Sequence, residues 1–318
     1  MIEVRLRPTG PWRAGHRTGD RERVDAIYHS DAVYSAVTHA MNALGWLEEW
    51  LDATARAEST AVRFSSFFPY VGDTRLVPPP RTAWPPSGAG KLYVNAAKLV
   101  PVEVARQGVV NESRWTVDGG SECLLPVGRP APFQVLMRAA AAVDRITGQT
   151  EPHRTACLEF APGAGWWGLI DIKPDIANAE WEPRVKSALR LLADSGFGGE
   201  RSRGWGRTAE PEFTDASSMF GAGHEGAWWM LSLYSPHSSD AIDWSRGDYA
   251  TLTRGGWTDS AAGGSIRKKQ VRMIEEGSVV MAPSLHGRAV DVAPEGFPHP
   301  AWRAGFALAV PVPLEVEA

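Results

Sequence analysis

The chain has 318 residues, of which 43% are hydrophobic and 22% are charged, a composition typical of folded globular proteins and not of disordered ones. Its net charge of −4 argues against indiscriminate binding along nucleic acid but allows a local basic track. No apolar run approaches the roughly 20 residues of a membrane helix, and two cysteines are too few for a disulfide framework. We therefore expect a cytoplasmic protein of two domains, with no metal and no cofactor.

The first elements are indicated by hydrophobic periodicity. Alternating apolar and charged residues predict a strand over residues 1–6. Ser30 or Asp31 is expected to cap the helix that follows, whose apolar side chains recur at three- and four-residue spacing as far as Leu51. A further strand is predicted over residues 62–68. These elements form the start of a β-α-β unit.

A turn signal lies in the middle of the chain. Residues 114–117 and 122–125 have strand character and flank Asp-Gly-Gly-Ser at 118–121, which is a credible hairpin turn. We interpret residues 106–132 as a projecting hairpin, and a plain surface hairpin is the alternative.

The elements after this hairpin complete the first domain. Alanine-rich residues 134–143 are predicted to be helical, and residues 155–160 and 166–172 to be strands. A second helix over residues 181–192 leads through a loop into a strand at 208–213. The order β-α-β, insertion, β-β-α-loop-β is close to the ferredoxin-like or RRM-like plan.

Residues 220–223, Phe-Gly-Ala-Gly, resemble a domain boundary. We expect a short helical stretch after residue 240, and strands at 228–234, 249–254, 279–282, 288–292 and 306–312. The predicted fold class is therefore α+β, with an N-terminal domain at 1–218 and a smaller one at 224–318.

The most distinctive stretch is the glycine-arginine loop, residues 196–207, which contains five glycines and three arginines. Glycine permits positive φ and close approach of another backbone, while arginine matches phosphate oxygens in pairs. The pattern predicts contact with a polyanion through Gly198, Gly199, Arg201, Ser202, Arg203, Gly204, Trp205, Gly206 and Arg207.

Simpler interpretations of these features remain open. The loop could be an ordinary helix-to-strand connection that begins at Gly196. Trp205 could be a stacking platform for a base or could pack under its own loop. A second basic run, Arg267, Lys268, Lys269 and Arg272, could be a solvated face.

Several blocks of the chain together resemble the RAMP superfamily of CRISPR proteins. They are SDAVYSA at 30–36, FFPY at 67–70, DRITG at 144–148, GGERSRGWGR at 198–207, RGGW at 254–257, RKKQVRM at 267–273, GSVV at 277–280 and RAGF at 303–306. Within this superfamily, the chain is most similar to the fourth-named subunit of type III-A Csm effector complexes. The resemblance spans nearly the whole chain.

The resemblance implies two RRM-like RAMP domains and a non-catalytic role in binding the 5′ handle of crRNA. It also implies docking against the large polymerase-like subunit and the backbone RAMP subunit. By resemblance, His29 and Ser30 would face the RNA groove, Arg114 and Trp115 would lie on a thumb within residues 106–132, and Arg145 would contact phosphate. Arg267, Lys268 and Lys269 would reach RNA or the large subunit.

Two other functions are weighed against this one. Some RAMP relatives cut RNA, and His16, His29, His39 and His153 are possible bases, but no spacing joins two of them. Asp31 is better explained as a helix cap than as a cleaving aspartate. A protein-protein scaffold that binds no RNA alone is the third possibility.

Overall fold

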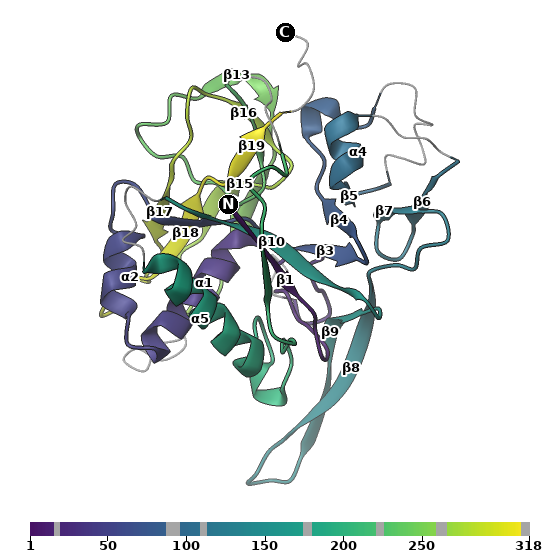
Figure 1. Cartoon of the computed structure of the whole chain (residues 1–318). Helices are drawn as coiled ribbons and strands as arrows, with labels where there is room; N and C mark the ends of the chain where they lie inside the picture. Colours follow the sequence, from purple (N-terminus) through teal and green to yellow (C-terminus); the bar gives the residue numbers. More distant parts are fainter. Residues whose placement is uncertain are drawn as a thin grey trace.

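The computed structural model describes residues 1–15, 20–86, 96–108, 113–173, 180–220, 226–258 and 266–312. The candidate base His16, residues 109–112 of the predicted hairpin and residues 221–223 of the predicted boundary lie outside these ranges. Most of the described elements are strands, and the principal helices gather on one side of the largest sheet (Figure 1).

A seven-stranded antiparallel sheet forms the N-terminal part. Along it the strands are β11 (Glu212–Asp215), β1 (Ile2–Leu6), β10 (Ala164–Ile172), β3 (Phe68–Val71), β4 (Thr74–Val77) and β5 (Val100–Pro101), while β2 (Val62–Phe64) also pairs with β10. The central position of β10 is consistent with its burial pattern, because seven of its nine residues are buried.

Helices α1 (Ser30–Ala43) and α5 (Trp181–Ser195) pack against each other beside this sheet (Figure 1). Their apolar residues, including Val37 and Leu189, share one core with Val4 and Ile170 of the sheet. The shorter helices are α2 (Leu47–Ala53) and α4 (Val102–Gln107), with a 3-10 turn η1 at Arg81–Ala83. The predicted strand at 1–6 and helices at 31–51 and 181–192 are confirmed, although α2 is a separate helix.

The C-terminal part contains only strands in the described ranges 226–258 and 266–312. A four-stranded sheet has the order β13 (Asp243–Asp248), β16 (Val279–Met281), β12 (Ala227–Met230), β19 (Ala309–Pro311). Two hairpins accompany it, β14 (Thr251–Arg254) with β15 (Val271–Ile274), and β17 (Gly287–Asp291) with β18 (Trp302–Phe306). The helical stretch expected after residue 240 is wrong, because β13 begins at Asp243 and pairs with β16.

The two parts share their cores. Trp167 of β10 lies in one hydrophobic cluster with Trp229 of β12 and Val310 of β19. On the helical side, the ring of Tyr34 meets that of Phe306 edge-on at 5.7 Å between centroids. Aromatic and aliphatic side chains therefore pack on both sides of the junction between the parts.

Residues 134–143 form a strand, so the helix predicted there is wrong. They belong to β8 (Phe133–Val143), which pairs along its whole length with β9 (Thr150–Phe160). Alanine's helix propensity is a weak preference that tertiary context overrides. Here β9 follows directly after a turn at Asp144–Gln149, and pairing with β9 outweighs the helix propensity of the alanines. The β8–β9 hairpin extends well away from the rest of the chain (Figure 1).

The hairpin predicted around residues 118–121 is confirmed. Strands β6 (Trp115–Asp118) and β7 (Cys123–Pro126) pair antiparallel, and Asp118 Oδ2 accepts hydrogen bonds from the backbone N–H and the hydroxyl of Ser121. However, Cys123 and Leu124 of β7 are fully buried. The segment therefore packs partly into the core, and the hairpin that projects farthest is β8–β9.

Candidate nucleic-acid interface

The glycine-arginine loop leaves α5 at Gly196, whose φ is 95°. The backbone N–H of Gly196, the C-cap residue of α5, donates the last i to i−4 hydrogen bond of the helix to Leu192 O at 2.8 Å. The next residue, Phe197, is fully buried and stacks on Trp12 with ring centroids 5.2 Å apart. The loop thus starts from a fixed anchor in the core.

Three glycines of the loop are required by contacts within this chain. A Cβ atom on Gly196 would lie 2.5 Å from Trp205 O, one on Gly198 would lie 2.3 Å from Arg13 O, and one on Gly206 would lie 2.0 Å from Phe197 O. The close approach that glycine permits is therefore made by the protein's own backbone. These contacts explain the three glycines without a ligand, and contact of Gly198 and Gly206 with a polyanion stays a prediction.

The loop is fastened to the segment that precedes α1. Gly206 N–H donates to Pro11 O at 2.9 Å, and Gly199 N–H donates to Arg13 O at 3.1 Å. The Arg13 side chain is buried, and its guanidinium donates to the carbonyls of Asp20, Arg21 and Ala156. Arg13 was not predicted as a site residue, and no local pattern distinguishes it from the other N-terminal arginines. The Arg13 backbone carbonyl holds the loop in place through its contact with Gly198 and its hydrogen bond from Gly199.

The cationic side chains of the loop lie on its outer side. Arg201, Ser202 and Arg203 form the 3-10 turn η2 (Arg201–Arg203), and these residues and Arg207 are exposed. Arg203 Nε lies 3.3 Å from the carboxylate of Glu200, which itself has a positive φ of 61°. A non-glycine residue in this conformation is strained and is characteristic of functional loops. The arrangement can offer guanidinium groups to phosphate oxygens from a rigid base.

Trp205 lies under the loop. Only 9% of its surface is exposed, so the packed interpretation holds and Trp205 is not a free stacking platform. Gly204 differs from the other loop glycines because a Cβ atom there would meet nothing within 4 Å, although its φ is 79°.

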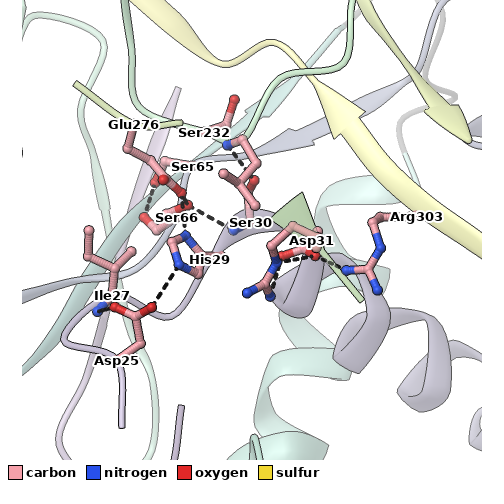
Figure 2. A network of polar contacts seen from close by, with 12 residues as sticks. Asp25, Ile27, His29, Ser30, Asp31, Ser65, Ser66, Ser232, Glu276 and Arg303 are labelled. Carbon is pink, nitrogen blue, oxygen red and sulfur yellow. Dashed lines mark hydrogen bonds and ion pairs between the residues drawn. The ribbon is translucent and has the colours of Figure 1, made fainter. Parts of the chain in front are cut away.

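His29 and Ser30 belong to a buried polar network at the start of α1 (Figure 2). His29 Nδ1 lies 2.9 Å from Glu276 and Nε2 lies 3.1 Å from Asp25. Ser30 accepts a hydrogen bond from Leu233 N–H at 3.0 Å. Both residues are 6% exposed, and their polar atoms bond within the protein. His29 nevertheless lines a hollow of about 730 Å³, together with Ser121 and Phe133.

Asp31 forms the charged centre of the junction between the two parts of the chain. Its carboxylate accepts two hydrogen bonds of 3.0 Å from Arg254 of β14 and another from Arg303 of β18 (Figure 2). Burial would raise the pKa of Asp31, but the two guanidinium groups outweigh this effect and hold the pKa well below its ordinary value.

The predicted capping role of Ser30 or Asp31 is wrong, since the N-cap residue is His29 and the helix start has no side-chain cap.

The network gives stability a dependence on pH. Burial would lower the pKa of His29, but Glu276 and Asp25 raise it to about 10, against about 6.5 in an unfolded chain. The stabilisation is therefore complete below pH ~6.5 and is lost as pH rises toward 10, with a slope of at most about 1.4 kcal/mol per pH unit. Urea unfolding of wild type and His29→Gln between pH 6.5 and 10 measures how the free energy of unfolding of each protein changes with pH. If both proteins lose stability in parallel, His29 is not the group responsible.

The remaining predicted residues lie on separate elements. Arg114 is exposed beside β6, Trp115 is half-buried within it, and Arg145 is exposed in the turn between β8 and β9. In the second basic run, Arg267 and Lys269 are exposed while Lys268 is half-buried. The structure therefore brings together only the residues of the glycine-arginine loop.

Comparisons with known proteins agree with this architecture. Residues 224–312 match the family model of the CRISPR Csm4 C-terminal domain. A curated CRISPR system protein Csm4 of Thermococcus onnurineus strain NA1 is 25% identical over 296 residues, which cover 88% of this chain and 86% of the relative.

Two solved structures share the fold over almost their whole length. A chain of the Csm3-Csm4 subcomplex of the type III-A CRISPR-Cas interference complex has a TM-score of 0.65 at 15% identity, covering 98% of this chain and 99% of that one. A chain of the Csm1-Csm4 cassette in complex with cA4 has a TM-score of 0.59 at 18% identity, covering 99% and 98%.

The mixed α/β architecture, rich in strands, is the fold that this chain shares with these two solved chains. The chain is thus similar to Csm4 proteins, through the family model in its C-terminal part and through the curated relative over most of its length. None of the described helices is long and apolar enough to cross a membrane.

Proposed function

We propose that this chain is a non-catalytic subunit of a type III CRISPR ribonucleoprotein that binds the 5′ handle of crRNA. The observation that carries the proposal is the glycine-arginine loop. Arg201, Arg203 and Arg207 are exposed on a turn whose base is fastened by Phe197 and by bonds to Pro11 and Arg13. Arginines held in place lose less conformational entropy on binding, so they suit a phosphate backbone that passes over them.

The same proposal includes two protein partners, the large polymerase-like subunit and the backbone RAMP subunit. The similarity to chains from Csm1-Csm4 and Csm3-Csm4 assemblies supports it. We also propose that residues 1–218 and 224–318 are the two RAMP domains. The Asp31 cluster with Arg254 and Arg303 would then join them.

Two hairpins are candidates for the thumb that separates handle from guide. The first lies within residues 106–132 and carries Arg114 and Trp115. The second is β8–β9, which carries Arg145 in its turn. We favour β8–β9 because most of β8 is exposed, whereas β7 is buried.

The loop assignment is tested by the double variant Arg201→Ala/Arg203→Ala. Each lost charge-assisted contact is expected to weaken binding of labelled crRNA handle about tenfold. The dependence of log affinity on log salt should flatten by up to ~0.7 per lost contact. Fluorescence anisotropy across a salt series measures both quantities. Arg56→Ala, an exposed arginine on the α2 side, is the matched control, and an affinity and slope equal to wild type in the double variant would contradict the assignment.

The enzyme alternative, a RAMP endoribonuclease that processes repeat RNA, has less support. Of its candidate bases, His29 is buried between two carboxylates, while His39 and His153 lie on separate elements, α1 and β9. Incubation of the chain with labelled repeat RNA and EDTA is expected to give no specific cleavage. Specific cleavage that is lost in His29→Ala would favour the enzyme.

The scaffold alternative is tested by co-purification of the chain with its protein partners, with and without RNase. Partners that remain bound after RNase treatment, with no RNA bound to the chain alone, would favour the scaffold.

A further inference from the structure

Residues 11–14 lie between the β8–β9 hairpin and the glycine-arginine loop. On one edge, Trp12 and Leu158 of β9 form an antiparallel pair that exchanges both backbone hydrogen bonds, at 2.9 and 2.8 Å. On the other edge, the carbonyl of Arg13 accepts the hydrogen bond from Gly199 of the loop at 3.1 Å. Successive residues of an extended chain direct their backbone groups to opposite edges. The segment therefore joins the base of the hairpin to the loop as a middle strand would.

The side chain of Arg13 makes the same connection a second time. Its Nη1 donates to the carbonyls of Ala156 in β9 and of Arg21, both at 2.9 Å, and its Nη2 donates to the carbonyl of Asp20 at 3.0 Å. The aliphatic part of the side chain lies against the loop, because a Cβ atom on Gly199 would be 3.2 Å from Arg13 Cδ. One buried side chain thus contacts both the hairpin and the loop.

These contacts lie where the hairpin leaves the core. Residues 155–158 of β9 are at most 1% exposed, whereas residues 150–152 and 154 are exposed. The N–H of Ala156 donates to Arg21 O at 2.8 Å, and its carbonyl accepts from Arg13. Both backbone groups of Ala156 are therefore held just before β9 extends away from the rest of the chain (Figure 1).

We propose that Arg13 is a positioning residue that keeps the glycine-arginine loop and the β8–β9 hairpin in one fixed arrangement, so that a single RNA chain contacts both. The inference rests on the proposed function, which assigns the handle to the loop and the thumb to this hairpin. A fixed spacing between two binding elements raises the effective concentration of the second contact once the first is made. Arginine suits this role because its planar fork reaches several carbonyls at once, whereas lysine carries a compact ammonium on a flexible stem.

The first test measures the arrangement without RNA. Asp194→Cys at the end of α5 and Ile146→Cys in the hairpin turn place spin labels on two exposed positions, and both native cysteines are buried. Double electron-electron resonance is expected to give a narrow distance distribution in the labelled chain and a broader one when Arg13→Lys is added. Arg23→Lys is the matched control and should keep the narrow distribution, since the Arg23 side chain is 65% exposed.

The second test compares two RNAs by fluorescence anisotropy, the 5′ handle alone and the handle extended by guide sequence. Arg13→Lys is expected to bind the extended RNA about tenfold more weakly than wild type, through loss of effective concentration. Its affinity for the handle alone should be unchanged, because the backbone carbonyl of Arg13 still holds the loop. A purely structural role would weaken both RNAs together. Arg13→Met, which leaves no charge in the buried site, is the second variant if Arg13→Lys does not fold, and it should give the same two results.

Three results would overturn the proposal: a distance distribution in Arg13→Lys equal to that of the control, an unchanged affinity for the extended RNA, or an equal loss of affinity for both RNAs. Failure of the proposed function is a separate result. It would appear as an unchanged handle affinity in Arg201→Ala/Arg203→Ala, whereas the distance measurement without RNA decides independently whether Arg13 joins the loop to the hairpin.

Discussion

Replacing Asp31 by asparagine is expected to lower the free energy of unfolding by about 3–5 kcal/mol, as for breaking one partner of a buried ion pair. The carboxylate has no exposed surface, and the side chains of Arg254 and Arg303 are only 11% and 10% exposed. Asparagine preserves the shape but removes the negative charge. Two guanidinium groups would then be buried close together without the carboxylate that accepts their hydrogen bonds, and the ion pairs that join the two parts of the chain would be lost.

The control for this substitution is Asp52→Asn on α2. Asp52 pairs with Arg56 at the surface, where its side chain is 67% exposed, so its loss should cost at most about 1 kcal/mol. Urea unfolding followed by intrinsic tryptophan fluorescence at neutral pH measures both variants. Equal midpoints for Asp31→Asn and Asp52→Asn would mean that the Asp31 cluster does not hold the junction together.

The elements that could be predicted from sequence are those whose periodicity is local. The stripe from Val33 through Met41 defines α1, and the alternation at residues 1–6 defines β1. Residues 134–143 could not be predicted in this way, because what makes them a strand is pairing with β9, and nothing in the alanine run encodes that partner.

The candidate site was predictable only in part, for the same reason. The arginines of residues 201–207 are exposed, which the local sequence suggested. The internal role of Gly198 could not be predicted, because the backbone that approaches it belongs to Arg13, 185 residues earlier in the chain. In the sequence, Asp31 likewise resembles a helix cap. Its pairing with Arg254 could not be predicted, because the two residues are 223 positions apart. Contacts of such sequence separation leave no signature in a short motif.

Gly206→Ala is expected to disrupt the glycine-arginine loop and to lower the free energy of unfolding by about 3 kcal/mol or more. The added Cβ would lie 2.0 Å from Phe197 O and 2.8 Å from Phe197 N, at a φ of 77°. The left-handed conformation costs a non-glycine residue roughly 1–2 kcal/mol. Moving the backbone apart also breaks the bonds from Phe197 N–H to Gly206 O and from Gly206 N–H to Pro11 O, each worth about 0.5–1.5 kcal/mol.

Gly204→Ala provides the matched comparison within the same loop. Its φ of 79° is nearly the same, but nothing lies within 4 Å of the added Cβ, so only the conformational cost of roughly 1–2 kcal/mol applies. Urea unfolding and handle-RNA anisotropy on both variants separate the cost of the left-handed backbone conformation from the cost of the clash between the added Cβ and Phe197. Gly206→Ala should lose both stability and RNA affinity, because Arg201 and Arg203 would no longer be held on a fixed base. Equal losses in the two variants would show that the fastening of the loop to Phe197 and Pro11 does not position its arginines.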